Sequence, residues 1–154
     1  SMATLCTHDM PTLRGFWHCE DLKLGKEVGL YPEQSQLNQL FDDRLQAKQG
    51  VLSSVAWHGN LAEGIGQDAS HVAMDEALSN SLQLHLAAGS SSLLSLQLED
   101  WLAMDKPVNI PGTVDQYPNW RRKLSITLDE IFNRQEVNEL TKRLTDIRAQ
   151  ASRT

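Results

Sequence analysis

Hydrophobic residues in the second quarter of the chain follow the period of an α-helix. Their spacings are close to three, four and seven residues, which places them on one face of a helix expected over residues 33–57. Gly50 interrupts the stretch, and because glycine costs about 1 kcal/mol relative to alanine inside a helix, a kink or a break into two helices is expected there. The expected apolar face consists of Leu37, Leu40, Phe41, Leu45, Leu52 and Val55.

A second helix is predicted over residues 75–88. Leu78, Leu82 and Leu86 repeat at every fourth position, and Gly89 follows as an ending signal.

A third helix is predicted near the C-terminus. Asn133 followed by Glu136 has the spacing of a capping box, which predicts the start of the helix there. Fewer than three heptads are sustained, so we expect this helix to pack on the chain's own core rather than in a coiled coil. Its apolar face consists of Val137, Leu140, Leu144 and Ile147.

Two short apolar segments are predicted to be strands. The first opens the chain and ends near Asp9. The second covers residues 92–98, which are apolar on both faces, as in a strand buried on both sides in a parallel sheet. Between the first strand and the long helix, Pro11, Gly15 and Gly25 indicate a loop.

The order of strand, helices, strand and helices is that of βα units and predicts an α/β fold. The second strand is followed by a predicted helical turn at residues 99–104 and an irregular loop at residues 106–120, and loops of that length are usually functional or disordered. A (β/α)₈ TIM barrel needs about 250 residues, so 154 residues with two such units would supply at most its last quarter, plus extra helices. We expect such an isolated chain to be mostly helical.

The composition is that of one ordinary globular domain. With 154 residues, 40% of them hydrophobic, the chain is long enough for one core and too short for two. The formal net charge of −6 would repel nucleic-acid phosphates and anionic membranes, so neither is an expected partner. Cys6 and Cys19 lie in a sequence with no secretory or membrane-spanning segment, which favours a reducing, cytoplasmic location. Ser1 and Met2 are interpreted as residues left by expression, and residues 1–154 as one fragment of a longer domain.

His8 and Asp9 are the first candidates for chemistry, because they lie at the carboxyl end of the first predicted strand, where barrel enzymes place their reacting groups. A polar strand end entering a loop is the alternative interpretation. A metal site would add His18 and Cys19, but further paired ligands at short spacing are missing, so we expect no metal. A metal-dependent phosphohydrolase built on His8 and Asp9 ranks last among the functions considered.

The remaining histidines and the basic residues show no catalytic pattern. His58, His71 and His85 are scattered, and we expect surface or hydrogen-bonded core histidines. Residues 121–123 form the one basic cluster, which is interpreted as a salt-bridged structural corner rather than a phosphate site. Glycine-rich phosphate loops, Gly-x-Ser-x-Gly elbows and Cys-x-x-Cys pairs are absent from the sequence.

Five short segments combine into a more specific pattern. They are residues 7–17 (THDMPTLRGFW), 29–32 (GLYP), 99–102 (EDWL), 107–113 (PVNIPGT) and 117–124 (YPNWRRKL). Together they closely resemble the C-terminal part of the bacterial amylomaltase family, the disproportionating 4-α-glucanotransferases of glycoside hydrolase family 77. The resemblance runs in order over about the whole chain, and the last two segments are its most specific part.

The resemblance implies a parent enzyme with an α-amylase-like (β/α)₈ barrel, which cuts an α-1,4-glucan and transfers a segment to the 4-hydroxyl of an acceptor glucose or glucan. Such a retaining, double-displacement reaction needs a carboxylate nucleophile and an acid/base group about 5–5.5 Å apart. In the family these are an Asp and a Glu on earlier barrel strands, so the resemblance implies that they are absent here and that this chain alone is inactive. The implied partners are maltodextrins and glucose, in glycogen and maltodextrin metabolism, with no cofactor.

The resemblance also implies roles for residues of this chain. Asp9 matches the third carboxylate, which hydrogen-bonds ring hydroxyls of the sugar at the cleavage site and stabilises the transition state. His8 matches the sugar-binding histidine beside it. The residues that match the loop closing the same pocket are Asn109, Pro111 and Gly112. The residues of the following segment, which would either touch sugar or brace the loop, are Asn119, Trp120 and Arg121.

A second hypothesis belongs to a different class of function. It is a non-catalytic α-glucan-binding or assembly module that uses Trp17 or Trp120 as a stacking platform. In either case, parallel strands without their neighbours expose apolar surface and unpaired backbone groups. We therefore expect the isolated chain to self-associate or exchange strands.

Overall fold

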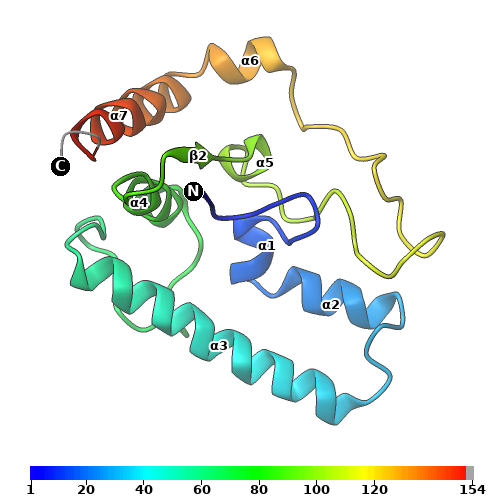
Figure 1. Ribbon diagram of the computed structural model, residues 1–154. Coiled ribbons are helices and arrows are strands. Elements are labelled where there is room, and N and C mark those ends of the chain that lie inside the picture. The colour runs from blue at the N-terminus through cyan, green and yellow to red at the C-terminus, as the bar shows by residue number, and fades with distance from the viewer. Residues whose placement is uncertain (152–154) are drawn as a thin grey trace.

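The computed structural model describes residues 1–151, which form seven helices and two strands (Figure 1). Among these residues, no helix is long and apolar enough to cross a membrane. The elements in chain order are β1 (Met2–Thr4), α1 (Leu13–Trp17), α2 (Glu20–Glu27), α3 (Gln34–Trp57), α4 (Glu76–Ala87), β2 (Leu93–Ser95), α5 (Leu98–Trp101), α6 (Leu128–Phe132) and α7 (Gln135–Ala151).

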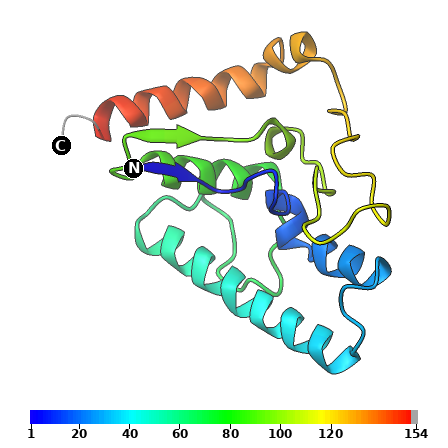
Figure 2. The same cartoon turned by 45° about the vertical axis from the view of Figure 1, so that its right-hand side comes forward.

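β1 and β2 form a two-stranded parallel sheet, in which Met2 lies opposite Leu93 and Thr4 lies opposite Ser95. Figure 2 shows the strands side by side, with α7 above them and α3 at the bottom of the molecule. Because the strands run in the same direction, they end at the same edge of the sheet. The loops that follow them therefore start next to each other.

The prediction that the second strand is buried on both faces is wrong for this chain. β2 is three residues long, and Leu93 is 64% exposed. A strand is buried on both faces only where other elements cover both, and within residues 1–151 the sheet has just two strands.

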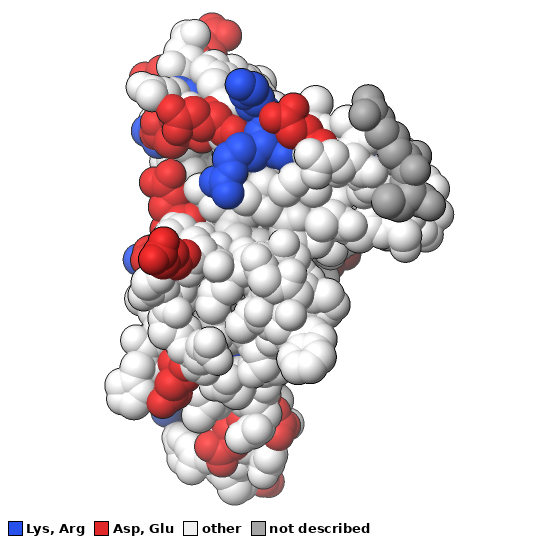
Figure 3. All heavy atoms as spheres, turned by 90° about the vertical axis from the view of Figure 1, so that its left-hand side faces the viewer, with Lys and Arg blue, Asp and Glu red and all other residues white. Residues whose placement is uncertain are grey.

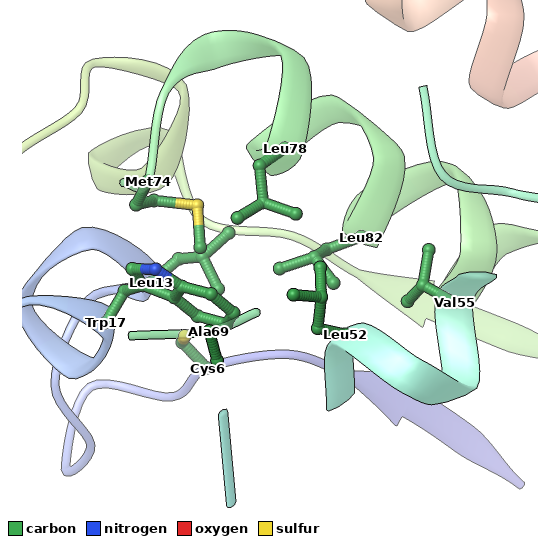
Figure 4. Close-up of a cluster of buried hydrophobic side chains, with 9 residues drawn as sticks. All are labelled: Cys6, Leu13, Trp17, Leu52, Val55, Ala69, Met74, Leu78 and Leu82. Carbon is green, nitrogen blue, oxygen red and sulfur yellow. The ribbon is translucent and has the colours of Figure 1, made fainter. Parts of the chain in front are cut away.

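The larger hydrophobic core lies between α1, α3 and α4, and Figure 4 shows its side chains. Trp17 is the largest of them and is 1% exposed, and its indole N–H donates to the Val72 carbonyl oxygen at 2.7 Å. Leu52 on α3 and Leu78 on α4 are fully buried in the same cluster. Full burial of such a leucine contributes about 2 kcal/mol, so this cluster fixes the position of α1.

A second cluster joins α4 to α7. Leu84 and Ala87 on α4 form it with Leu140 and Leu144 on α7, and Leu94 of β2 packs against the same group. The prediction that the last helix packs on the chain's own core is thereby confirmed. Because α4 contributes to both clusters, it is buried on two faces, and it connects the α3 side of the molecule to the sheet and α7.

α3 runs through Gly50 as one helix of 24 residues, which confirms the long helix predicted over residues 33–57, and the alternative of a break at Gly50 does not occur. Gly50 is exposed, and apart from the backbone of its own helix no atom lies within 4 Å of the place where a Cβ would stand. The predicted apolar face is only partly buried. Leu37, Leu52 and Val55 are buried, whereas Leu45, near the middle of the helix, is 38% exposed.

Two helices, α1 and α2, occupy the stretch for which the sequence predicts a loop. Thr12 caps α1 by accepting the Gly15 N–H on its Oγ1 at 3.0 Å. Gly15 and Gly25 lie at points where another segment packs closely against the helix, and not in turns. A Cβ on Gly15 would collide with the Asp105 carbonyl oxygen, and one on Gly25 would collide with the Tyr31 ring.

The capping box predicted at the start of the last helix is also wrong. Asn133 is the C-cap of α6, and α7 begins at Gln135. The capping box belongs to α6: Thr127 Oγ1 accepts the Glu130 N–H at 3.3 Å, and the Glu130 carboxylate accepts the Thr127 N–H at 2.8 Å. Both pairs have the same spacing in the sequence, so spacing alone does not distinguish them.

Candidate functional site

The loops that follow the two strands meet beyond one edge of the sheet. The loop after β1 carries His8 and Asp9, and the chain after α5 carries Asn109. Asn109 donates from Nδ2 to Asp9 Oδ1 at 2.7 Å, across 100 residues of sequence. The structure therefore brings the predicted carboxylate and the predicted loop asparagine into direct contact.

His8 links Asp9 to Trp120. The His8 Nε2 atom lies 3.1 Å from Asp9 Oδ2, so each carboxylate oxygen of Asp9 has a polar neighbour. The ring centroids of His8 and Trp120 are 5.1 Å apart. The side chains of His8 and Asp9 are 60% and 51% exposed, so a ligand in solution can reach both.

Asn119 shapes the loop that carries Asn109. Its Oδ1 accepts the Ile110 N–H at 2.9 Å, and its Nδ2 donates to Thr113 Oγ1 at 2.8 Å. These bonds tie two parts of one loop together. The contacts of Asn119 within this chain are thus those of a brace.

Trp120 has a left-handed backbone conformation, with a φ of 62°. This region is strained for a bulky residue, at a cost on the order of 1–3 kcal/mol, and such residues concentrate at functional sites. The Trp120 N–H donates to the Val108 carbonyl oxygen at 3.0 Å, which holds the backbone in place. The indole is 62% exposed beside His8 instead of being buried in the core.

Pro111, Gly112 and Arg121 lie on exposed parts of the same loop. Gly112 has a φ of 85°, a conformation that glycine adopts without strain. No heavy atom lies within 4 Å of the place where its Cβ would stand, so this turn is open to solvent.

Residues 121–123 do not form the predicted salt-bridged corner. In the part of the chain that the structure describes, none of the three makes an ion pair. Arg122 instead donates from Nη2 to the Tyr117 hydroxyl at 3.1 Å, and that hydroxyl donates to the Pro107 carbonyl oxygen at 2.5 Å. The buried Tyr117 ties the end of the loop to its beginning. The sequence analysis includes Tyr117 in the segment 117–124 but gives it no role, because the sequence does not show which backbone group its hydroxyl meets.

The other histidines have structural contacts away from Asp9. His18 Nε2 accepts the Met74 N–H at 3.2 Å, and burial lowers the pKa of His18. His85 Nδ1 lies 2.9 Å from the Asn60 amide nitrogen, and its pKa is also lowered, chiefly by burial. Over residues 1–151, no group of three or more His, Cys, Asp or Glu side chains is placed to hold a metal ion.

A cavity of about 230 Å³ lies between α1, α4, α5 and the start of α7. None of the predicted site residues lines it. The group around Asp9 therefore lies on an open surface of this chain and not inside a closed pocket.

Most of the chain, including the group around Asp9, matches one protein family. The family model described as 4-alpha-glucanotransferase covers residues 1–128. The chain belongs to this family, glycoside hydrolase family 77. The resemblance carried by the five sequence segments is confirmed.

Two curated relatives are both named 4-alpha-glucanotransferase. A 4-alpha-glucanotransferase of Haemophilus influenzae is 37% identical over 131 residues, which cover 85% of this chain and 19% of that protein. One from Mycobacterium tuberculosis is 27% identical over 139 residues, which cover 85% of this chain and 18% of that protein. The chain thus spans about a fifth of the length of the curated relatives that it matches.

The fold is shared with a solved member of the family. The crystal structure of amylomaltase from Corynebacterium glutamicum superposes with a TM-score of 0.75 at 22% sequence identity. The match covers 93% of this chain and 21% of that one. Nearly the whole of this chain therefore has the fold of a part of amylomaltase.

Proposed function

We propose that this chain is the C-terminal portion of the catalytic (β/α)₈ barrel of a 4-α-glucanotransferase. Two observations support its place in a barrel. The adjacent strands are parallel and each is followed by helices, as in successive βα units, and the chain covers only about a fifth of its relatives. In such barrels the loops at the carboxyl ends of the strands carry the active site, and His8, Asp9 and Asn109 lie on such loops.

The hydrogen bond from Asn109 to Asp9 is the observation that carries this proposal. It holds Oδ1 of a half-exposed carboxylate, while His8 lies at Oδ2. A carboxylate fixed in this way can accept hydrogen bonds from the ring hydroxyls of a bound glucose unit. These bonds strengthen as the ring approaches an oxocarbenium-like state, so Asp9 acts as a transition-state stabiliser.

The remaining site residues surround this carboxylate in the proposal. His8 binds the same sugar, and the loop with Asn109, Pro111 and Gly112 closes the pocket beside it. Asn119 braces that loop, and Trp120 presents its exposed indole next to His8. Arg121 is exposed on the same loop and would either touch sugar or brace the loop.

The bond-breaking groups of the proposed reaction lie outside this chain. A reaction that retains the configuration of the anomeric carbon needs a nucleophile and an acid/base about 5–5.5 Å apart. A covalent glycosyl-enzyme then forms, and the 4-hydroxyl of an acceptor captures it. The substrates would be maltodextrins and glucose, and the setting the cytoplasm, where thiols such as Cys6 and Cys19 stay unpaired.

The first test replaces Asp9 in the complete enzyme. Asp9→Ala should lower the turnover of maltotriose by about 10²-fold or more, because the hydrogen bonds that this substitution removes are strongest in the transition state. Folding should change little, since the side chain is 51% exposed. The control is Asp42→Asn, which removes an exposed carboxylate on α3 and should leave turnover unchanged. An unchanged turnover of Asp9→Ala would remove this residue from the site.

The second test uses the 154-residue chain itself. Incubated with maltotriose, it should release no glucose and form no longer maltodextrins, because effective catalysis depends on groups held in one geometry. Robust transfer by the pure chain would show that the nucleophile has been misplaced.

The alternative function, a glucan-binding module, is supported by the exposure of Trp120 alone. Trp17 is 1% exposed and donates to a backbone carbonyl, so it cannot stack on a sugar. Calorimetry with maltodextrins distinguishes the two functions. Measurable affinity of the isolated chain that disappears in Trp120→Ala would favour the module, whereas the barrel interpretation expects weak binding.

A further inference from the structure

A buried carboxylate in α5 lies outside the proposed site and has no role in the reaction as described above. Asp100 is 7% exposed, and its Oδ1 accepts the Leu13 N–H at 2.7 Å. Leu13 is the residue immediately after residues 7–12, the loop that carries His8 and Asp9. Cys6, the residue immediately before the loop, is buried in the core cluster that also contains Leu13. Asp100 therefore holds the downstream end of this loop directly.

The downstream end of the loop is fixed to the same region a second time. Thr12 donates from Oγ1 to the Met104 carbonyl oxygen at 2.6 Å. Gly15 lies so close to the Asp105 carbonyl oxygen that a Cβ would not fit between them. Arg14 forms an ion pair with Asp105 at 2.7 Å. Residues 100–105 thus anchor the downstream end of the 7–12 loop.

Residues 100–105 also lead directly into the other half of the site. The loop that begins at residue 106 carries Asn109, which reaches back to Asp9. Both loops therefore start from one anchor, and the alignment of Asn109 with Asp9 depends on how residues 7–12 are held on it.

The burial of Asp100 indicates that hydrogen-bond acceptor atoms are needed at this position. A carboxylate is costly to bury, and a leucine of similar shape would fill the same volume without that cost. Asp100 instead gives its Oδ1 to a backbone donor. Burial raises the pKa of Asp100 to about 6, whereas the hydrogen bond from the Leu13 N–H acts in the opposite direction and favours the carboxylate.

We propose that Asp100 is a positioning residue for the glucan-transfer reaction, which holds the downstream end of the 7–12 loop at Leu13 and thereby sets the place of Asp9 against Asn109. This inference rests on the proposed function. Asp100 touches no substrate, and its effect on the reaction passes entirely through the loop.

The test compares two substitutions in the complete enzyme. Asp100→Leu removes the acceptor of the Leu13 N–H at nearly constant shape, and kcat for maltotriose should fall by about tenfold or more, because small misplacements of a reacting group are costly. KM should stay within about twofold, since the contacts of Asp9 are strongest in the transition state. Asp100→Asn keeps an amide oxygen that can accept the Leu13 N–H, and it should recover most of kcat. The matched control is Glu99→Gln, which removes the neighbouring carboxylate of α5 and should leave kcat unchanged.

Amide hydrogen exchange on the 154-residue chain gives a readout that does not depend on activity. In Asp100→Leu the amides of residues 7–12 should exchange at least about tenfold faster, while the amides in the middle of α4 keep their wild-type rates. If Asp100→Leu does not fold, Asp100→Asn carries the test, with a smaller but measurable acceleration confined to residues 7–12.

The outcomes separate the two proposals. If the wild-type complete enzyme transfers no glucan, the proposed function fails, and the exchange rates still decide whether Asp100 clamps the loop. If Asp9→Ala abolishes transfer but Asp100→Leu keeps wild-type kcat and exchange, the function stands and the clamp is overturned. An effect confined to KM, or an equal fall of kcat in the Asn and Leu variants, would also overturn it.

Discussion

Asp9 and Asp100 are two carboxylates in opposite surroundings. Asp9 is 51% exposed between Asn109 and His8, whereas Asp100 is 7% exposed and accepts a backbone N–H. The exposed group can exchange its water for sugar hydroxyls, and the buried one cannot. The same residue type is thus suited to binding in one place and to holding a loop in the other, because burial decides which partners it meets.

The pKa of Asp100 predicts a specific pH dependence of stability. Its value of about 6 in the folded chain lies above the ordinary 3.8, chiefly because of burial, with a further rise from the neighbouring charge of Glu99. The folded state therefore keeps a proton that the unfolded chain has already released. This contribution to stability is complete below about pH 4 and disappears as the pH rises through 6.

Asp100→Asn removes this titration. Between about pH 4 and pH 7, the free energy of unfolding of the wild type should fall relative to that of Asp100→Asn, by an amount on the order of 3 kcal/mol. Urea titrations across this range measure the difference, in which other titrating groups cancel. Glu99→Gln should keep most of this fall, because burial of Asp100 raises its pKa more than the charge of Glu99 does. Parallel curves for wild type and Asp100→Asn would show that burial does not perturb this carboxyl.

At the scale of elements, α1 owes its place to a glycine at the point of closest approach. A Cβ on Gly15 would meet the Asp105 carbonyl oxygen and Thr12 Oγ1, and both residues are held by other bonds. Gly15→Ala should destabilise the chain by about 1–3 kcal/mol, because the helix has to move away from the segment beneath it. Thermal or urea unfolding measures the effect.

The matched control for this prediction is the glycine in α3. Gly50 is exposed inside a helix with free space around its Cβ position, so Gly50→Ala should stabilise the chain by about 0.5–1 kcal/mol. The two alanine substitutions are thus expected to have opposite signs. A stabilising Gly15→Ala would mean that α1 does not pack on the segment near Asp105.

Elements with a sustained period are the ones that the sequence pattern locates. The helix predicted over residues 75–88 is observed as Glu76–Ala87, with Asp75 accepting the Leu78 N–H on its side chain as the N-cap. The pattern misses α1 and α2, since five and eight residues are too few to display a period. Glycines that serve close contacts resemble turn glycines, because a sequence does not show what lies opposite a missing side chain.

At the scale of the whole molecule, the sheet within residues 1–151 is small and exposed. Its two strands leave Met2 63% and Leu93 64% exposed. The residues of both strands, MAT and LLS, are uncharged. Figure 3 shows the side of the molecule at the left of Figure 1, where charged groups lie along one margin, near the top and at the bottom. A short, open, uncharged sheet lacks the charges that keep strand edges apart.

We therefore expect the isolated chain to self-associate through this sheet. Light scattering between micromolar and hundreds of micromolar concentration should give a mass that rises above 17.3 kDa. Leu93→Lys should return it to the monomer, because a charge at the strand opposes pairing. Val51→Lys, at an exposed position of α3, is the control and should not. A strict monomer at every concentration would contradict the expectation.

The sequence by itself determined what depends on neighbouring residues: the long helices, the irregular loop after residue 106, the family and the pair of His8 with Asp9. The tertiary structure decided what depends on contacts between distant segments. Asn109 reaches Asp9 across 100 residues, and Asp100 reaches Leu13 across 87. Periodicity and short motifs are local properties, and they can be read in order along a chain. Which loop meets which carboxylate follows from the packing of the core and the direction of two strands, and no local pattern records it.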